Sequence, residues 1–271
     1  MQNSQPIGIF DSGIGGLTVA RSIKNLMPKE RLIYFGDTAH LPYGDKSVAA
    51  IQAYAIKIAD LLRSKGCKVI VIACNSASSA AYELLTEYLR KIKIINVIDP
   101  MVSMLVHNFS HKKVGLIGTK RTVESNVYKI KTDACQQGIA LHSLATPLLV
   151  PMIEEGFFNN NISHEIIAQY LADEQLANID ALVLGCTHYP LIKSEIEDYY
   201  QQNNQSAPAV LDSSEVVAQA LYDYLDQQNL LATQVSGDDE FLVSDYTHSF
   251  EKSTERFFNK KVPLQKHPLW E

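Results

Sequence analysis

Short apolar runs rich in Val, Ile and Leu alternate along the chain with longer segments in which apolar residues recur every three or four positions. The short runs have the length and composition of buried strands, and the longer segments have the period of amphipathic helices. Strands that alternate with helices in this way are typical of βα units around a parallel sheet with both faces covered. The pattern therefore predicts an α/β protein.

The predicted strands form two series of four. The first series covers residues 7–12, 31–37, 69–74 and 93–99. The second series covers residues 114–119, 140–146, 181–186 and 209–214. When the two series are matched in order, their separation is nearly constant, so that Leu116 corresponds to Ile9 and Cys186 to Cys74. Such self-similarity indicates two related α/β lobes.

Every predicted strand ends in small or polar residues, among them Asp11, Ser12, Asp37, Cys74, Asn75, Asp99, Thr119, Thr146, Cys186, Thr187, Asp212 and Ser213. Ligands of open parallel sheets bind at the carboxyl ends of the strands. Chemistry is therefore expected at these ends, two of which carry a cysteine in equivalent positions.

Cys74 and Cys186 are the main candidates for reactive groups. Each ends an apolar strand and precedes a predicted helix, whose start is indicated by Asn75 and Ser76 in the first case and by Pro190 in the second. The unpaired N–H groups and the dipole of a helix N-terminus favour a thiolate over a thiol. The alternative interpretation is that both cysteines only pack as small apolar residues.

Other strand ends offer groups that could bind a ligand. The glycine-rich turn at residues 11–16 can bring its backbone close to a ligand, and the helix after it can hold an anion. The turn Pro42-Tyr43-Gly44 could bind a carboxylate through its amides and its phenol. The hydroxyls of Thr119 and Thr122 are expected to face the same cleft.

Two further charged candidates lie in the second half of the chain. Glu154 and Glu155 stand among apolar residues, and only one of the two side chains can point inward. His188 follows Cys186 by two positions and could orient or protonate a neighbouring group near neutral pH.

Composition narrows the class of protein. A chain of 271 residues with 46% hydrophobic residues can bury a sizeable core, as one large domain or two small ones. The net charge of −6, with no long basic run, argues against a nucleic-acid or anionic-membrane partner. No apolar stretch reaches the roughly 18 residues of a membrane span, and the N-terminus lacks a signal-peptide core. We expect a cytoplasmic protein that binds a small molecule.

The four cysteines are expected to be free thiols, because disulfides are rare in that compartment and no pair has the C-x-x-C spacing of a zinc or redox site. Cys67 and Cys135 do not end a strand, and we expect them to be inert. No metal site is expected.

A nucleotide-binding oxidoreductase is a weaker alternative. Gly13 and Gly15 precede a predicted helix, and Asp37 ends the next strand, as in a dinucleotide-binding fingerprint. The third glycine position holds Thr18, however, and the fingerprint explains neither strand-end cysteine. A further alternative is a two-lobed protein that binds a ligand without catalysis.

Two thiols on opposite sides of a cleft suit racemisation. One thiolate can remove the proton from a carbon atom while the other thiol delivers a proton from the far side. The carboxylate of the substrate must then be held by N–H and O–H donors, since charge develops on its oxygens as the proton leaves.

Six motifs carry a resemblance to a known family: "IGIFDSGIGGLTV", "YFGDTAHLPYG", "IACNSASS", "GLIGTKRTVES", "LVPMIEEG" and "LVLGCTHYPLI". Together, and in this order from residue 7 to about residue 192, they closely resemble the glutamate racemases of the aspartate/glutamate racemase superfamily. The resemblance implies a cofactor-independent enzyme that interconverts L- and D-glutamate and supplies D-glutamate for bacterial peptidoglycan. It also implies a homodimer.

The fold implied by the resemblance has two pseudo-symmetric flavodoxin-like lobes with the active site in the cleft between them. Residues 1–98 and 208–271 would form the first lobe, which the C-terminal segment completes, and residues 99–207 the second.

The resemblance also implies residue roles. Cys74 would act on the D-enantiomer and Cys186 on the L-enantiomer, assisted by Asp11 and His188 respectively, with Glu154 as a further catalytic residue. The residues that would hold the substrate are Asp11, Ser12, Tyr43, Gly44, Asn75, Ser76, Thr119, Thr122, Thr187 and His188.

Two departures from the family pattern bear on these expectations. Ser76 stands where threonine is common, which keeps the hydroxyl group. The chain begins almost at its first predicted strand, without the extension of those members that need a peptidoglycan precursor as activator, so dependence on an activator is not expected. An aspartate racemase of the same superfamily is the nearest alternative, although "PYG" and "CTHYP" favour glutamate.

Overall fold

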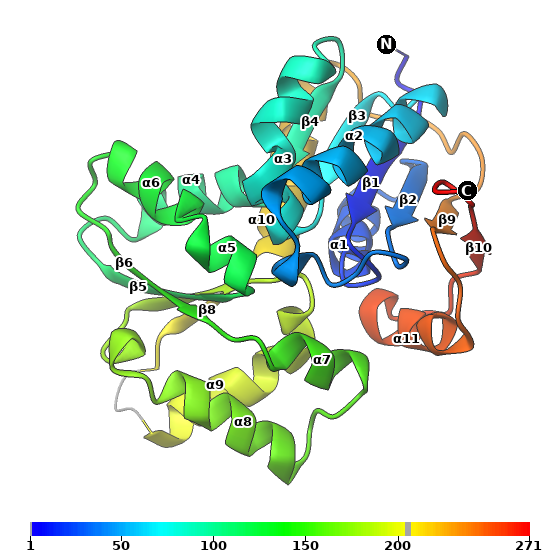
Figure 1. Ribbon diagram of the computed structural model, residues 1–271. Coiled ribbons are helices and arrows are strands. Elements are labelled where there is room, and N and C mark those ends of the chain that lie inside the picture. Colours follow the sequence, from blue (N-terminus) through cyan, green and yellow to red (C-terminus); the bar gives the residue numbers. More distant parts are fainter. Residues whose placement is uncertain (1, 204–206) are drawn as a thin grey trace.

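Two parallel sheets of unequal size, each covered by helices, form two lobes (Figure 1). The computed structural model describes residues 2–203 and 207–271, with all their side chains except those of residues 248, 249 and 252. Residue 1 and residues 204–206, which the predicted lobes include, lie outside the described part. The predicted α/β class with two flavodoxin-like lobes is confirmed.

The first lobe is built on a six-stranded sheet with the strand order β10-β9-β2-β1-β3-β4 and parallel pairing throughout. Its strands are β1 (Ile7–Asp11), β2 (Leu32–Gly36), β3 (Val69–Ile72), β4 (Lys93–Asn96), β9 (Glu240–Val243) and β10 (Leu264–Lys266). The first four were predicted, whereas β9 and β10 were not.

The second lobe is built on a four-stranded parallel sheet with the order β6-β5-β7-β8. Its strands are β5 (Lys113–Gly118), β6 (Ala140–Ala145), β7 (Ala181–Gly185) and β8 (Ala209–Asp212), and all four were predicted. The order repeats that of β2, β1, β3 and β4, which is the topology expected of two related lobes.

Helices follow most of the strands. Those of the first lobe are α1 (Leu17–Leu26), α2 (Val48–Ser64), α3 (Asn75–Tyr88), α4 (Ile98–Asn108), α10 (Ser213–Gln227) and α11 (His248–Phe258). Those of the second lobe are α5 (Lys120–Glu124), α6 (Val127–Ala134), α7 (Leu149–Glu154), α8 (Asn161–Leu171) and α9 (Lys193–Asn203). Single 3₁₀ turns are η1 (Tyr43–Asp45), η2 (Glu174–Leu176) and η3 (Tyr189–Ile192).

The strands β1, β2 and β3 of the first sheet are buried along their whole length, and since successive side chains point to opposite sides, both faces are covered. Phe10 of β1 packs in the core beneath α2 and α3. Ile9 packs in the core beneath α1. This core continues past α4 and α10 into the second lobe. The two lobes therefore share one of their cores.

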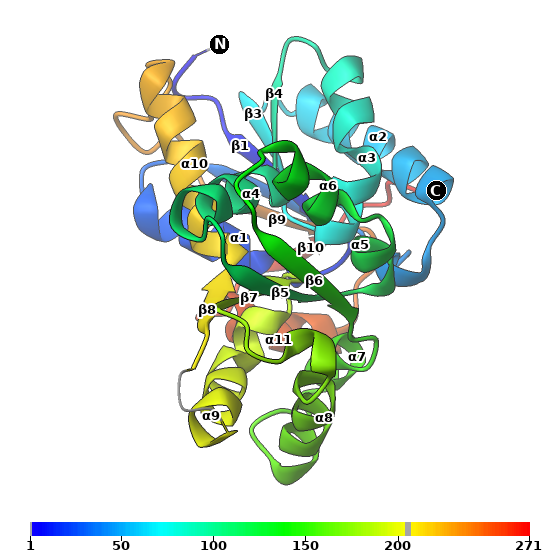
Figure 2. The same cartoon turned by 90° about the vertical axis from the view of Figure 1, so that its left-hand side faces the viewer.

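The return of the chain to the first lobe differs from the prediction. The boundary was expected at residue 208, but β8 pairs with β7, so the second sheet extends through Asp212. The chain then crosses back as α10, which packs against α1 and α4 (Figure 2). The apolar pattern at residues 209–214 had already indicated a strand of the second series, and hydrogen bonding to β7 places it there.

None of the helices in the described part of the chain combines the length and the apolar character that crossing a membrane requires.

A buried ion pair ties the returning segment to the first sheet. Lys68 lies immediately before β3 and donates to Glu30 Oε2 at 2.7 Å and to the carbonyl oxygens of Asn3 and Leu230, each at 2.8 Å. Glu30 Oε1 accepts the N–H of Ala232 at 2.8 Å. Both charged side chains are almost fully enclosed. The pair thus joins the N-terminal residues, β3 and the segment that follows α10.

We predict that Lys68→Met strongly destabilises the fold. Removing one partner of a buried ion pair leaves the other charge uncompensated, which typically costs about 3–5 kcal/mol. Lys129→Met is the matched control, since its pair with Asp133 is exposed on α6 and such pairs contribute about 0.3–0.5 kcal/mol. Denaturant unfolding measures both. Similar losses for the two variants would contradict this account of the Lys68 pair.

Candidate functional site

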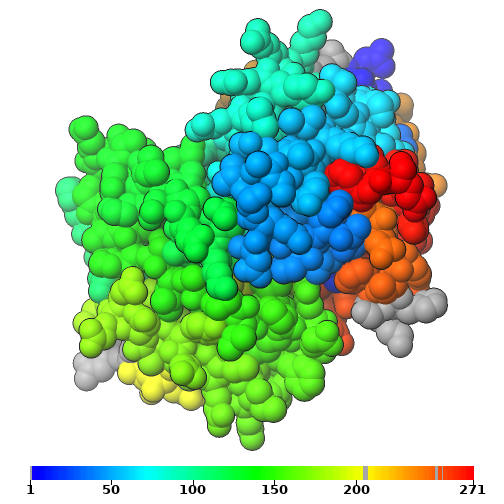
Figure 3. Space-filling model, in the orientation of Figure 1, coloured from blue at the N-terminus to red at the C-terminus, as the bar shows by residue number. Residues whose placement is uncertain are grey.

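A cavity of about 190 Å³ lies between the two lobes. The carboxyl ends of strands from both sheets reach it, as the sequence predicted for the site of chemistry. Its volume is below the roughly 300–1,000 Å³ of pockets for drug-sized ligands, so it suits a small molecule. Figure 3 shows that on one side the surface of the first lobe, in blue, meets the surface of the second lobe, in green.

Most of the residues predicted for the site line this cavity. They are Ser12, Tyr43, Gly44, Cys74, Asn75, Ser76, Thr119, Glu154, Cys186, Thr187 and His188. Asp11 and Thr122 do not line it but lie directly behind it, where they hydrogen-bond to Thr187 and Thr119 respectively.

Cys74 is itself the N-cap of α3, a position that the sequence had suggested for Asn75 or Ser76. The Sγ atom accepts the N–H of Ala77 at 3.4 Å, and the thiol donates to Ser12 Oγ at 3.6 Å. Burial, together with the negative charge of Asp11, nevertheless raises the pKa of Cys74 to about 12 against the effect of these hydrogen bonds. The expectation that the helix N-terminus favours a thiolate at Cys74 is therefore wrong, because burial outweighs it.

Cys186 has different surroundings from Cys74. It follows β7 directly, but the next element is the 3₁₀ turn η3 with Pro190 in its first turn, and α9 begins only at Lys193. Its hydrogen-bonding partner is the imidazole of His188, with 3.7 Å between Sγ and Nδ1. An imidazole therefore takes the place beside Cys186 that a helix amide takes beside Cys74.

His188 connects Cys186 to Glu154. Its Nε2 atom lies 3.0 Å from Glu154 Oε1, and of the two neighbouring acids Glu154 lines the cavity while Glu155 is exposed. Burial opposes the charged form of the imidazole, but the hydrogen bonds to Cys186 and Glu154 outweigh it and raise the pKa of His188 well above its ordinary value. The contacts of His188 thus favour the protonated imidazole, which can donate to Cys186.

Asp11 is a fully buried carboxyl group at the end of β1. It accepts the N–H of Gly13 at 3.0 Å and the hydroxyl of Thr187 at 3.4 Å. Burial raises its pKa, and the charge of His188 and nearby backbone amides oppose that rise in part. Asp11 thus contacts the loop that carries Cys186 while acting electrostatically on Cys74.

Asn75 presents an unsatisfied donor at the site. Its Oδ1 atom accepts the hydroxyl of Tyr128 at 2.8 Å across the lobes, but its buried Nδ2 atom has no hydrogen-bond partner among the described residues. An unpaired buried amide is costly, and a ligand with an acceptor oxygen would satisfy it.

A chain of hydroxyls closes one side of the cavity. Ser76 Oγ lies 2.9 Å from Thr119 Oγ1, which lies 3.2 Å from Thr122 Oγ1. Gly44 packs on the same threonine, and a Cβ atom at Gly44 would come within 3.0 Å of the Thr119 Cβ atom. A side chain at position 44 would therefore press on Thr119 across the junction of the lobes.

The phenol of Tyr43 is already engaged, which corrects the expectation that it could donate to a carboxylate. Its hydroxyl donates to Asp37 Oδ2 at 2.6 Å. Tyr43 also begins the turn η1, whose first N–H groups have no acceptor within the turn. The donors that this turn can offer to a ligand are therefore its amides.

Asp37 does not suit the ribose of a dinucleotide. Its Oδ1 atom accepts from Ser244 and from Trp270, each at 2.8 Å, and its Oδ2 atom accepts from Tyr43. The side chain is fully buried and does not line the cavity. The geometry therefore gives no support to the nucleotide-binding alternative.

The cavity also has lining residues that sequence reasoning missed, namely Leu41, Asp45, Lys120, Pro147, Val150 and Pro151. Pro42 and Thr146 line it too, and the sequence analysis had named the first in a turn that could bind a carboxylate and the second at a strand end. Val150 and Pro151 belong to α7, of which the sequence analysis had singled out only Glu154 for the site, because the other residues of that helix are apolar.

Comparisons with known proteins show which family the chain belongs to. The model of the Asp/Glu/hydantoin racemase family matches residues 9–221. The chain is 39% identical over 259 residues to a glutamate racemase of Chlorobium phaeobacteroides, which covers 95% of this chain and 94% of that protein.

Solved structures of glutamate racemases are similar to this structure. The glutamate racemase of Francisella tularensis in complex with D-glutamate has a TM-score of 0.91 and 37% sequence identity, and the alignment covers 99% of each chain. The glutamate racemase of Thermus thermophilus in complex with β-chloro-D-alanine has a TM-score of 0.88 and 37% sequence identity, and the alignment covers 98% of each chain.

We predict that Glu154→Gln lowers the pKa of His188, because the imidazolium loses its carboxylate partner. The imidazole signals of His188 in an NMR titration measure this shift. Glu155→Gln is the matched control, since Glu155 is exposed and does not line the cavity, and it should leave the titration unchanged. Equal shifts in the two variants would show that Glu154 is not the group that holds the proton on His188.

Proposed function

Since the chain belongs to the glutamate racemases of the Asp/Glu/hydantoin racemase family, we propose that it interconverts L- and D-glutamate in the cavity between its lobes. The observation that carries the proposal is the position of Cys74 and Cys186. They follow equivalent strands of the two sheets and line one small cavity. A substrate carbon held between them would present one face to each sulfur.

In the direction from L to D, Cys186 is the base and Cys74 the acid. The Cys186 thiolate removes the α-proton of L-glutamate, and the Cys74 thiol delivers its own proton to the opposite face of Cα. The high pKa of Cys74 supports this assignment, because that group is a thiol before turnover. A protonated His188 donating to Cys186 would stabilise negative charge on that sulfur.

In the reverse direction the roles exchange. Turnover of L-glutamate leaves Cys74 as the thiolate and Cys186 as the thiol, which is the state that accepts the α-proton of D-glutamate and returns a proton to its other face. Asp11 acts on Cys74 through its charge, whereas His188 contacts Cys186 directly and is itself held by Glu154. Asp11 and His188 would thus serve different cysteines.

Hydrogen-bond donors from both lobes would bind the carboxylates of glutamate. The unpaired Nδ2 of Asn75 and the amides of Tyr43 and Gly44 come from the first lobe. The hydroxyl of Thr119 comes from the second lobe, whereas that of Thr187 already donates to Asp11. As the α-proton leaves, charge develops on the α-carboxylate, and donors fixed in advance stabilise it.

The reaction needs no cofactor in this proposal, because the two cysteines supply both proton transfers. Its product would serve peptidoglycan synthesis in the cytoplasm. The family resemblance also supports a homodimer, for which light scattering in solution gives a direct test.

We expect the protein to keep its full activity in the racemisation of L-glutamate after dialysis and treatment with a chelator. Circular dichroism follows the reaction. L-Aspartate under the same conditions tests the nearest alternative, and it should react much more slowly. Activity that depends on added pyridoxal phosphate, nucleotide or metal would contradict the proposal that the reaction needs no cofactor. Faster turnover of aspartate than of glutamate would overturn the substrate assignment.

We predict that Cys74→Ala and Cys186→Ala each abolish nearly all racemisation. Loss of a general acid or base typically costs about 10²- to 10⁴-fold in rate, and each direction of the reaction needs both groups. Cys67→Ala and Cys135→Ala are the controls, the first buried away from the cavity and the second exposed. If either control lost as much activity with its fold intact, the reactive pair would be wrongly assigned.

A further inference from the structure

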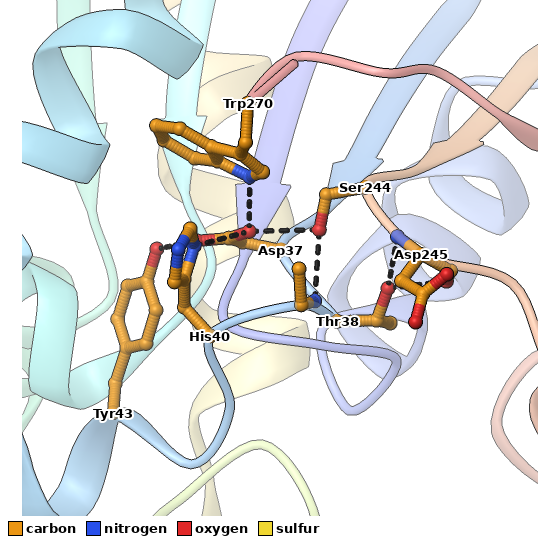
Figure 4. A network of polar contacts seen from close by, with 8 residues as sticks. Asp37, Thr38, His40, Tyr43, Ser244, Asp245 and Trp270 are labelled. Carbon is orange, nitrogen blue, oxygen red and sulfur yellow. Dashed lines mark hydrogen bonds and ion pairs between the residues drawn. The ribbon is translucent and has the colours of Figure 1, made fainter.

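A cluster of hydrogen bonds around Asp37 joins the cavity to the C-terminal segment (Figure 4). Asp37 directly follows β2 and is fully buried. Its carboxylate accepts the hydroxyl of Tyr43 at 2.6 Å, the hydroxyl of Ser244 at 2.8 Å and the indole N–H of Trp270 at 2.8 Å. His40 Nδ1 lies 3.0 Å from the same carboxylate. Three distant parts of the chain thus meet at one buried charge.

Tyr43 is the member of this cluster that lines the cavity. The bond from its hydroxyl to Asp37 holds its ring, and the backbone of the same residue opens the turn η1. The amides of Tyr43 and Gly44 can bind a carboxylate only if that turn stays in place. The orientation of Asp37 therefore helps to fix the amides of Tyr43 and Gly44 that the cavity offers to a ligand.

Trp270 is held over Asp37 by its surroundings. The pairing of β10 with β9 brings the chain to this point, and the N–H of His267 donates to the carbonyl of Val243 at 2.9 Å. The indole ring meets His40 edge-on, with 4.6 Å between centroids, and the ammonium group of Lys57 lies 4.9 Å from the indole centroid. The indole N–H is therefore aimed at Asp37 by packing on several sides.

Ser244 supports the same carboxylate from a second side. It stands directly after β9, donates to Asp37 Oδ1 and accepts the N–H of Ala39 at 2.9 Å. Trp270 donates to that same oxygen. Because a buried carboxylate is costly unless its oxygens are hydrogen-bonded, loss of either donor lets Asp37 shift towards its remaining partners.

We propose that Trp270 is a positioning residue for the racemisation of glutamate: by donating to Asp37 it holds Tyr43, and with it the amides that bind a carboxylate of the substrate. This inference rests on the proposed function. It assigns a role in substrate binding to a residue near the C-terminal end of the chain that does not line the cavity.

The direct test is Trp270→Phe, which removes the N–H but keeps an aromatic ring for His40, Tyr54 and Lys57. The variant loses a hydrogen bond to a charged group, and part of that loss reaches the turn η1 through Asp37 and Tyr43. The KM for both enantiomers should therefore rise by about 3- to 10-fold. The kcat and the melting temperature should stay close to those of the wild type. Lys57→Met is the matched control, because it removes the cation over the same ring and leaves the N–H intact.

Ser244→Ala gives an independent second test. It removes the other donor to Asp37 Oδ1 and should raise the KM in the same way while Trp270 stays in place. Trp270 is the one tryptophan of the sequence, so an unchanged emission spectrum verifies its position in this variant.

The possible outcomes separate this inference from the proposed function. If the wild type and Lys57→Met racemise glutamate but both Trp270→Phe and Ser244→Ala keep KM within twofold of the wild type, the positioning role is refuted and the function stands. A fall in melting temperature with an unchanged KM likewise refutes it, since the role of Trp270 would then be structural. A wild type without activity on glutamate refutes both.

Discussion

Burial of the reactive side chains between the lobes is the constraint on which the chemistry of the site depends. Burial is the largest influence on the pKa values of Asp11, Cys74 and His188. For the first two it favours the neutral group, and for His188 specific hydrogen bonds overcome it. The two cysteines consequently differ before any substrate arrives, although they occupy equivalent positions in the two sheets. Cys74 holds its proton in an enclosed helix cap, whereas Cys186 faces an imidazole that can donate one.

Enclosure in turn requires the two lobes to stay close together. Hydroxyl contact between Ser76 and Thr119, and the bond from Tyr128 to Asn75, cross the junction at the cavity. A shared hydrophobic core continues behind them from the first sheet to the second, and α10 packs along it. A junction held by such contacts suits a reaction in which two groups must face the same carbon atom from opposite sides, since small displacements are costly in such geometry.

The sequence predicted those parts of the structure that follow from local patterns. Buried strands were found from their apolar runs, and several residues that line the cavity, such as Ser12, Cys74 and Cys186, follow the strand ends where the sequence placed the chemistry. Both signals are local, because each lies within a few positions of the chain. Contacts between distant segments left no such signal. Strands β9 and β10 are short, and β10 is largely exposed. Trp270 meets Asp37 across a separation of 233 positions in the sequence, which no local pattern shows.

Local rules also failed where burial decided the outcome. A helix N-terminus predicts a thiolate, yet at Cys74 burial prevails. The phenol of Tyr43 was a plausible donor for a ligand, but its hydroxyl donates its hydrogen bond to the buried Asp37. The strand at residues 209–214 was recognised, but its place at the edge of the second sheet depended on pairing with β7.

The two-cysteine account is tested most directly by the isotope found in the product when the reaction is run in D₂O. If Cys74 and Cys186 face opposite sides of Cα, the proton removed by one sulfur is not the proton delivered by the other. The account therefore predicts that, early in the reaction and from either enantiomer, the product carries solvent deuterium at Cα while the remaining substrate carries little. Substantial transfer of protium from substrate into product, starting from both enantiomers, would show that a single base serves both faces and would contradict the account.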